Sequence, residues 1–259
     1  MLTTLDPNTR ALLYHLPHRP KSFPAIEITV VYFRSGYGPG DYIHPTSWAT
    51  RAYLERSRAI KCPTVLAQLA GSKKVQQVLA QPPAVDPPPQ SILTRFLPNA
   101  SPEVLARLRS TFAAIYPLDN STLGQQAKAI ATNPALAPGY VLKPQREGGG
   151  NNIYKSKIPE YLKSIPEDHW GGYILMELIV PPKMRNMIVR NGQVTNGEVV
   201  SELGVYGVCL WDARSKQDGG AGVQKNYEAG WLLRTKTSES EEGGVAAGFG
   251  CVDNVVLVD

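Results

Sequence analysis

Helical patterns dominate the first half of the chain, and one strand pattern interrupts them. The β-branched and aromatic run at 26–33 predicts a core strand. Apolar residues then recur at helical spacing, and Thr46 or Ser47 is the predicted cap of the first helix. The helices expected from this spacing cover 47–59, 65–79 with an interruption near Gly71, a segment that begins at Ser101-Pro102, and 123–131. The proline-rich stretch at 82–89 predicts an extended linker or surface loop.

Beyond Pro138 the pattern changes to strands and turns. Asn191-Gly192 and Asn196-Gly197 predict two tight turns. The expected strands are 141–142, 173–179, 187–190, 198–211 with breaks at Gly204 and Gly207, and 231–236. Helices that come first and a turn-rich sheet that follows favour an α+β fold of mixed α/β character over a strict βαβ alternation.

The segment with the clearest chemistry follows the strand pattern that ends at Leu142. It reads Lys-Pro-Gln-Arg-Glu-Gly-Gly-Gly-Asn-Asn-Ile-Tyr over residues 143–154. Its consecutive glycines leave backbone amides unshielded, and two cations stand beside them, so a strand that feeds this loop can hold a polyphosphate. Glu147 offers the hard oxygen donor that Mg²⁺ prefers. An ordinary glycine-rich hairpin loop with solvated charges fits the pattern equally well.

Later segments offer further candidates, each with a plainer alternative. The run at 173–179 could line a slot for an adenine ring, although core packing is the favoured interpretation of the strand alone. Glu202 could bind ribose hydroxyls or an ion, or lie on the solvent face of an antiparallel sheet. Arg234 and Lys236 alternate and should share a side, which suits an anionic ligand or a charge-guarded edge strand. The small residues at 243–250 would let a backbone approach a ligand closely.

Composition narrows the class of partner. The 259 residues carry 27 Lys and Arg against 22 Asp and Glu, and this mild excess without a long basic run predicts no nucleic-acid partner. Three widely spaced cysteines without a CxxC pair predict neither a zinc site nor disulfides, and they fit a reducing compartment. Neither a signal peptide nor an apolar run of membrane-spanning length is found, so we expect a cytoplasmic protein without a membrane partner. The P-loop, GxGxxG and GxSxG motifs are absent from the sequence.

Six segments, in order, resemble eukaryotic-type glutathione synthetase, a member of the ATP-grasp superfamily. They are 30–37 (VVYFRSGY), 68–77 (QLAGSKKVQQ), 141–152 (VLKPQREGGGNN), 174–177 (ILME), 201–204 (SELG) and 232–236 (LLRTK) with 243–248 (GGVAAG). The resemblance implies an incomplete ATP-grasp fold, with part of a Rossmann-like substrate-binding lobe at 1–95. It places a nucleotide-binding region at 96–259, including a Gly-rich lid at about 140–200.

The implied activity is that of an ATP-dependent ligase. It joins γ-glutamylcysteine to glycine through an acyl phosphate, with Mg²⁺ as the metal. Family members are commonly dimers, which implies a homodimer beside the small-molecule substrates.

The resemblance also assigns roles to individual positions. The implied ATP-binding residues are Lys73, Lys143, Pro144, Gln145, Arg146, Glu147, Gly148, Gly149, Gly150, Asn151, Asn152, Tyr154, Met176, Glu177, Leu178, Ile179, Glu202, Lys236 and Glu242. The implied substrate-binding residues are Arg34, Ser35, Gly36, Tyr37, Arg234, Val245 and Ala246. Arg234 and Lys143 are the implied catalytic residues, and Glu147 is the implied magnesium ligand.

The resemblance covers only the C-terminal half of the family's longer chain. In the family, the other half holds the remaining magnesium ligands, several dipeptide contacts and the strands next to 26–33. This strand is therefore expected to leave an exposed edge and apolar surface. The alternative function is a catalytically incomplete fragment that only binds nucleotide or serves as an interaction module.

Overall fold

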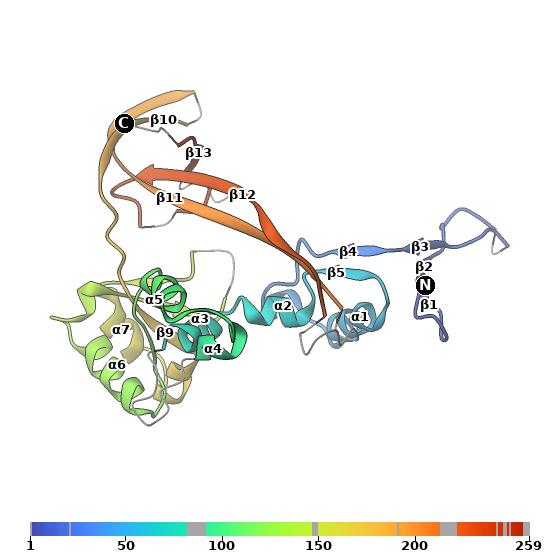
Figure 1. The fold of residues 1–259 in the computed structure, drawn as a ribbon, viewed down its shortest axis with the longest axis horizontal. Coiled ribbons are helices and arrows are strands. Elements are labelled where there is room, and N and C mark those ends of the chain that lie inside the picture. Colours follow the sequence, from blue (N-terminus) through green and yellow to red (C-terminus); the bar gives the residue numbers. More distant parts are fainter. Residues whose placement is uncertain are drawn as a thin grey trace. The chain divides into compact units, whose positions relative to one another are not determined.

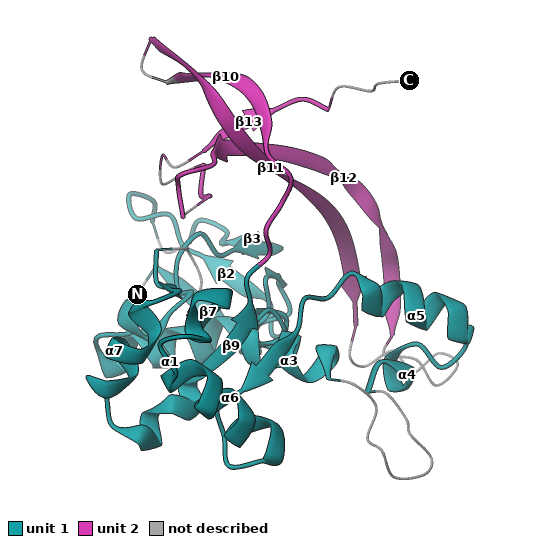
Figure 2. Ribbon diagram, turned by 90° about the vertical axis from the view of Figure 1, so that its left-hand side faces the viewer, with its two compact units in different colours: residues 1–178 teal, residues 179–259 magenta. Residues whose placement is uncertain are grey.

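The computed structural model describes residues 2–20, 22–81, 92–146, 150–190, 192–212, 222–241, 243–245, 248 and 250–255. The chain is a mixed α/β protein that divides into two compact units, residues 1–178 and 179–259 (Figure 2). The division into a lobe at 1–95 and a nucleotide-binding region at 96–259 stays a prediction. None of the helices in the described ranges has the length and hydrophobicity that a membrane-spanning helix requires.

Five short strands open unit 1: β1 (Thr3–Leu5), β2 (Leu12–Tyr14), β3 (Ile26–Ile28), β4 (Val30–Tyr32) and β5 (Ile60–Cys62). Strands β1, β2 and β3 form an antiparallel sheet, whereas β4 pairs in parallel with β5 (Figure 1). The prediction of one core strand at 26–33 is therefore wrong. The chain changes partner at Thr29, whose carbonyl accepts a hydrogen bond from the Ile60 amide at 2.8 Å.

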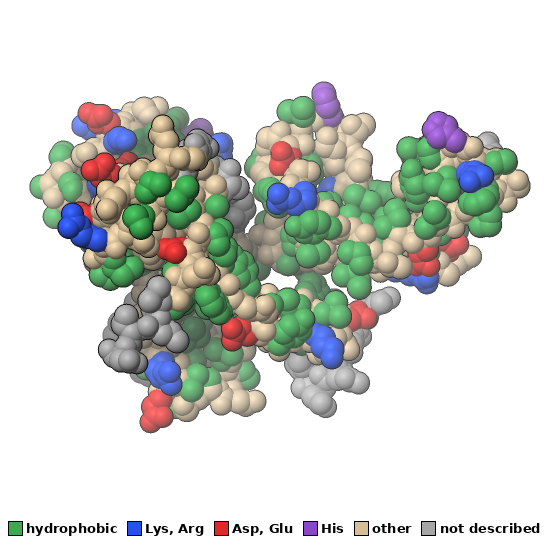
Figure 3. All heavy atoms as spheres, turned by 90° about the horizontal axis from the view of Figure 1, so that it is seen from above, with side chains coloured by type: hydrophobic (Ala, Val, Ile, Leu, Met, Phe, Trp, Pro, Cys, Tyr) green, Lys and Arg blue, Asp and Glu red, His purple; other side chains and the backbone are tan. Residues whose placement is uncertain are grey.

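The expected apolar surface on this segment is confirmed. Ile26, Val30 and Tyr32 are 51%, 52% and 65% exposed, and the β4–β5 sheet has two strands. Two strands bury too little area to form a core, which explains why Val30 and Tyr32 on β4 remain at the surface. Hydrophobic side chains are visible over much of the surface in Figure 3.

Short helices follow: η1 (Pro39–Asp41), α1 (Pro45–Arg56), α2 (Val65–Ala70), α3 (Lys73–Ala80), α4 (Ile92–Phe96) and α5 (Pro102–Ser110). The expected interruption near Gly71 and the helix start at Ser101-Pro102 are confirmed, and Ser101 accepts from the Val104 amide at 3.3 Å. The predicted cap of α1 is wrong. His44 occupies the cap position because Pro45, which lacks an N–H, takes the first helical turn. The predicted linker at 82–89 lies outside the described residues.

A four-stranded antiparallel sheet forms the best-buried part of unit 1. Its elements and neighbours are β6 (Ile115–Pro117), α6 (Thr122–Thr132), η2 (Ala137–Gly139), β7 (Tyr140–Pro144), β8 (Ile153–Tyr154), α7 (Lys157–Lys163), η3 (Glu167–Gly172) and β9 (Tyr173–Glu177). The strand order is β6-β9-β7-β8, and helices α6 and α7 contribute to the same apolar core. The core residues are Leu118, Ala127, Ala131, Ala137, Leu142, Ile158, Leu162 and Leu175.

Unit 2 is a four-stranded antiparallel sheet made of β10 (Met184–Arg190), β11 (Gln193–Trp211), β12 (Val223–Thr237) and β13 (Cys251–Asp253). Gly192 has the left-handed φ of +77° that a tight turn between β10 and β11 requires, while Asn191 lies outside the described residues. The turn predicted at Asn196-Gly197 is wrong, because these residues lie inside β11, paired with Met187 and Asn186. Strand β11 runs on through Gly204 and Gly207, with a register shift between Tyr206 and Gly207 in place of the expected break.

Gly124 lies in helix α6, which packs on the unit 1 core, and its substitution tests how tightly this helix packs. A Cβ at this position would lie 2.8 Å from the Asp119 carbonyl carbon and closer still to its oxygen. In an open helix, Gly to Ala stabilises by about 1 kcal/mol. We expect Gly124→Ala instead to lower the free energy of unfolding by roughly 1–3 kcal/mol, since the backbone must move. Chemical denaturation measures this value.

Gly171→Ala is the matched control for this prediction. No atom lies within 4 Å of a Cβ built at Gly171, so its stability should change by less than about 0.5 kcal/mol. A more stable Gly124→Ala protein would contradict the crowding that the structure describes.

Candidate functional site

Antiparallel pairing brings two predicted nucleotide-contacting segments together in unit 1. Lys143 on β7 pairs with Ile174 on β9, and Val141 pairs with Met176. Ile174 is fully buried whereas Met176 is half-buried. Strand β9 therefore contributes buried residues to the core near its start, whereas Met176 and the exposed Glu177 lie at its other end. The predicted hinge continues through Leu178, whose amide donates to the Gly139 carbonyl at 2.8 Å, and Ile179 begins unit 2.

The first residue after β7 also reaches the helix that carries Lys73. The side-chain oxygen of Gln145 accepts a hydrogen bond from the Lys74 backbone amide at 2.8 Å. Amides in the first turn of a helix lack intrahelical partners, and Ser72 makes no side-chain cap bond within the described chain. Gln145 thus caps α3 from a distant part of the sequence. This contact brings the start of α3, where Lys73 lies, to the start of the glycine-rich segment.

Strands β7 and β8, which hold the two ends of the glycine-rich segment, pair antiparallel as a hairpin. Gly150 has a φ of +69°, a conformation that favours glycine, and Asn152 donates its side-chain amide to the Tyr154 hydroxyl at 3.1 Å. The hairpin is compatible with both sequence interpretations, the phosphate lid and the plain loop. Several predicted residues lie outside the described part of the chain: Glu147, Gly148, Gly149, Glu242 and Ala246.

Lys74 and Asp119 join this neighbourhood although the sequence did not single them out. Lys74 Nζ lies 3.4 Å from Asp119 Oδ2, so the helix that carries Lys73 is also tied to the segment before α6. The hydrogen bond from the Ser121 hydroxyl lowers the pKa of the Asp119 carboxyl below its ordinary value, with a smaller contribution from Lys74. The only sequence signal for this contact is the adjacent lysine pair at 73–74.

The predicted dipeptide-binding segment at 34–37 is a loop folded around one carboxylate. Asp41 Oδ2 accepts from the amides of Gly36, Tyr37 and Gly38 at 3.0, 2.9 and 3.3 Å. Gln68 donates to the carbonyls of Gly36 and Tyr37 at 2.8 and 3.1 Å. The backbone groups of this loop are thus engaged within the protein. Its exposed side chains, Arg34, Ser35 and the 40% exposed Tyr37, are the parts left facing outward.

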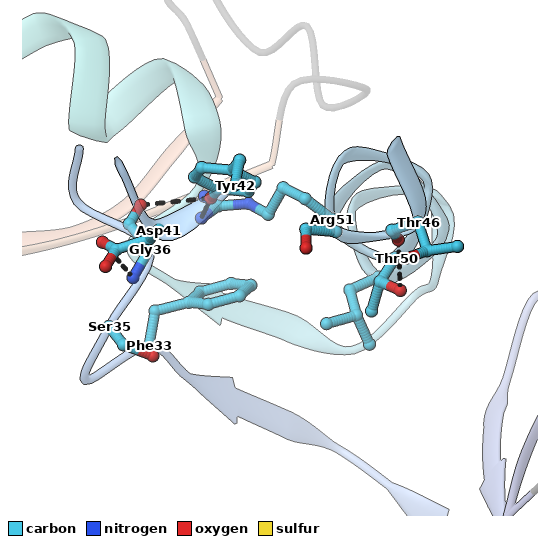
Figure 4. Close-up of a pocket in the computed structure, with 10 residues that line it drawn as sticks. Phe33, Ser35, Gly36, Asp41, Tyr42, Thr46, Thr50 and Arg51 are labelled. Atoms are coloured by element: carbon cyan, nitrogen blue, oxygen red, sulfur yellow. Dashed lines mark hydrogen bonds between the residues drawn. The ribbon is translucent and has the colours of Figure 1, made fainter. Parts of the chain in front are cut away.

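A hollow of about 390 Å³ lies beside this loop (Figure 4). Its lining comprises Phe33, Ser35, Gly36, Asp41, Tyr42, Thr46, Ser47, Thr50, Arg51 and Leu54. The Arg51 guanidinium stacks on the Phe33 ring at 3.9 Å and pairs with Glu55 at 3.0 Å. Phe33, just before the loop, and Arg51, on helix α1, thus form one wall of the hollow. Sequence patterns did not reveal this contact.

A second group of predicted residues converges in unit 2. Glu202 on β11 forms an ion pair with Arg234 on β12, with 2.9 Å between Oε1 and Nη2. A Cβ built at Gly243 would lie 3.7 Å from Glu202 Oε2 and 3.8 Å from Lys236 Cδ. The start of the small-residue segment therefore lies against both side chains, in agreement with the predicted common side of Arg234 and Lys236. Val245 belongs to the same segment, and its carbonyl accepts from the Gly248 amide at 2.9 Å.

The ion pair gives Glu202 the partner that a carboxylate in an apolar strand needs. Its side chain is exposed, which agrees with the alternative of a solvent-facing position, and Arg234 is half-buried. No group of three or more His, Cys, Asp or Glu residues that could hold a metal occurs among the described residues. Since Glu147 lies outside them, its role as a magnesium ligand stays a prediction.

A tyrosine pair lies at the start of β9, next to the glycine-rich segment. The hydroxyls of Tyr161 and Tyr173 are hydrogen-bonded, and their rings meet edge to face at 5.7 Å. Burial raises the pKa of Tyr173 from 10.0 to about 12, and Tyr161 adds to this shift. The positive charge of Arg146 lowers the pKa of Tyr173 and so opposes part of this shift.

This shift predicts a pH dependence of stability. The raised pKa means that the native chain holds the Tyr173 proton longer than the unfolded chain. The resulting stabilisation is complete below pH 10 and is lost as the pH rises toward 12. We expect Tyr173→Phe to flatten the fall in unfolding free energy across this window, as measured by urea titrations at several pH values. Tyr227→Phe, at an exposed position on β12, is the control, and equal slopes for wild type and Tyr173→Phe would contradict the assignment.

Comparison with known proteins places these segments in a family context. The family model described as eukaryotic glutathione synthase, ATP-binding domain, matches residues 15–257. The chloroplastic glutathione synthetase of Solanum lycopersicum is 43% identical over 234 residues, which are 89% of this chain and 39% of that protein. The glutathione synthetase of Homo sapiens is 44% identical over 230 residues, 88% of this chain and 44% of that protein. The chain thus spans less than half the length of these relatives.

A solved structure extends the comparison to the fold. A glutathione synthetase-like effector from Globodera pallida, in its apo form, is similar with a TM-score of 0.62 and 20% identity, covering 99% of this chain and 46% of that one. At this identity the likeness concerns the fold alone. The family match confirms the resemblance identified from the six sequence segments. Because the matching family model covers nearly the whole chain, this protein belongs to the family of eukaryotic glutathione synthases, within their ATP-binding domain.

Proposed function

We propose that the chain is the nucleotide-binding part of an ATP-dependent ligase that joins γ-glutamylcysteine to glycine. The observation that carries the proposal is the hydrogen bond from the Lys74 amide to Gln145. It supports the assignment of Lys73, Lys143 and the glycine-rich segment to one phosphate-binding surface. In this proposal Met176 to Ile179 form the adenine side of the site. The proposal includes an ATP-grasp fold with a Rossmann-like lobe at 1–95 and a nucleotide-binding region at 96–259.

The proposed reaction has two steps. The γ-phosphoryl group of ATP is transferred to the dipeptide carboxylate, which gives an acyl phosphate and ADP. The glycine amine then attacks the acyl carbon, loses a proton and expels phosphate, forming the new amide bond. Such a transfer needs positioning and compensation of negative charge, which lysines and backbone amides supply and bound Mg²⁺ would complete.

Water is the main competitor for an acyl phosphate, so a cover over the site is part of the proposal. The hairpin between β7 and β8 and the small-residue segment at 243–250 are the two candidates for this cover. In unit 2, Arg234 is the proposed contact for the substrate carboxylate and Lys236 for the nucleotide, with Glu202 beside both. Val245 and Ala246 would complete the substrate side.

A second candidate function is favoured by the exposed apolar strands. Ile26, Val30 and Ile60 lie at the surface of small sheets, a feature typical of surfaces that another polypeptide covers. In this case the chain acts as an interaction module or binds nucleotide without catalysis. A homodimer and a cytoplasmic location remain predictions, and some relatives are named as chloroplastic.

Ligase activity is tested by phosphate release from the purified chain. With ATP, Mg²⁺, γ-glutamylcysteine and glycine, we expect phosphate release that requires both amino-acid substrates. Lys143→Met should abolish it, because the neutral side chain leaves the transferred phosphoryl charge uncompensated. Lys163→Met, at an exposed position on α7, is the control and should keep wild-type activity. Absence of substrate-dependent phosphate release would reject catalysis by this chain.

Nucleotide binding is tested separately by thermal unfolding. A ligand that binds only the native state stabilises it, by about 2.7 kcal/mol at a hundred times Kd. ATP with Mg²⁺ should therefore raise the Tm, and Lys143→Ala should cancel the rise while Lys163→Ala keeps it. A rise without phosphate release would favour the nucleotide-binding fragment. Wild-type protein with no rise would reject the nucleotide site and leave the interaction module.

A further inference from the structure

The buried hydroxyl of Thr235, which lies between Arg234 and Lys236 in the sequence, takes part in hydrogen bonds that cross the unit 2 sheet. Thr235 on β12 is 1% exposed. Its hydroxyl donates to Asp253 Oδ2 on β13 at 2.7 Å, and it lies 2.8 Å from the Ser201 hydroxyl on β11. Three neighbouring strands are thus linked through side chains as well as through their backbones.

The number of hydroxyl protons determines which group donates in each of these hydrogen bonds. A hydroxyl has one proton, and that of Thr235 is used toward Asp253, so the Ser201 hydroxyl must donate to Thr235. Asn186 on β10 donates a further hydrogen bond to the same Asp253 oxygen at 3.3 Å. The carboxylate therefore collects donors that come from two other strands. Removal of the Thr235 hydroxyl would take one donor from Asp253 and the acceptor from Ser201.

The small-residue segment begins at Gly243 and ends at Gly250, and we call these two residues its neck. Gly250 lies against the backbone of Thr235. A Cβ built at Gly250 would lie 3.0 Å from the Thr235 carbonyl oxygen and 3.2 Å from that of Gly243. Cys251 Sγ lies 3.4 Å from the Thr235 carbonyl oxygen as its hydrogen-bond donor. Glycine at position 250 is what permits this close approach. Gly250 therefore lies against β12 at Thr235, the residue whose hydroxyl links the three strands.

The same residue separates the two cations proposed to bind ligand. Alternation along β12 directs Arg234 and Lys236 away from the side of the Thr235 hydroxyl. Gly243 lies against Lys236 and Glu202, and Glu202 pairs with Arg234. The spacing of these charged groups therefore depends on how β12, β13 and the neck are held together.

We propose that Thr235 and Asp253 are positioning residues, which hold the neck against β12 and so set Arg234, Lys236 and Glu202 for an anionic ligand. The inference rests on the proposed nucleotide site for its ligand. Thr235 does not touch that ligand, because its side chain is fully buried. Its contribution acts through the strand and the neck.

The test uses Thr235→Val, which keeps the shape and β-branching but removes the hydroxyl. We expect the Kd for ATP with Mg²⁺ to rise roughly tenfold, because both hydrogen bonds of the buried Thr235 hydroxyl are lost. Without nucleotide, the amides at 250–253 should exchange with deuterium faster in this variant, while those of β10 keep their wild-type rates. Thr235→Ser restores the hydroxyl and should return the Kd to within about threefold of wild type.

Thr237→Val is the matched control. It makes the same substitution on the same face of the same strand, where Thr237 has no side-chain hydrogen bond recorded within the described residues. It should leave both Kd and exchange unchanged. Ser201→Ala serves as a second variant if Thr235→Val fails to fold, and it should shift both readouts in the same direction by a smaller factor.

The outcomes separate this inference from the proposed function. Wild-type protein without nucleotide binding would reject the proposed function, and the exchange at 250–253 would still test the neck. Unchanged exchange in Thr235→Val would overturn the inference. So would a wild-type Kd in a folded Thr235→Val protein, or a Thr235→Ser protein that binds as weakly as Thr235→Val.

Discussion

The antiparallel pairing of β7 with β9 is the constraint on which the arrangement of unit 1 depends. It buries Leu142 and Leu175 in the same core that α6 and α7 complete. The next residues along β7, Lys143 and Pro144, leave that core and lead directly to Gln145, which caps α3. The pairing of apolar residues on β7 and β9 therefore determines where the glycine-rich segment at 143–154 begins. A slip by one residue would break the pairing of Leu142 with Leu175, which places both side chains in this core.

In unit 2, the positions of the candidate site residues are fixed by polar contacts more than by burial. Its long strands β11 and β12 carry many exposed side chains, so burial alone defines little of their geometry. Fixed points come instead from polar contacts: the Glu202–Arg234 ion pair on one side and the hydroxyl chain through Thr235 on the other. Exposed ion pairs contribute little to stability, whereas a buried hydroxyl that loses its partners is costly. Because Thr235 is buried, its hydrogen bonds are the stronger determinant of position.

Helix starts and interruptions were predictable from the sequence, whereas the pairing between distant strands was not. Ser101 before proline, and the interruption near Gly71, act within a few residues and were predicted correctly. The change of sheet at Thr29 and the continuation of β11 through Asn196-Gly197 depend on distant strands, which no local pattern contains. The same holds for the site. Motifs selected Gln145, but only the folded chain reveals that its side chain caps α3.

The loop at 34–37 carries a consequence for ligand choice. Asp41 is tethered a few residues away and already fills the concave face formed by three successive amides. A free anion would compete with a group whose effective concentration is set by a short tether, typically in the millimolar range or above. This loop therefore selects against phosphate capture by its main chain. In the proposed substrate site, recognition by this loop would therefore depend on its exposed side chains, Arg34, Ser35 and Tyr37.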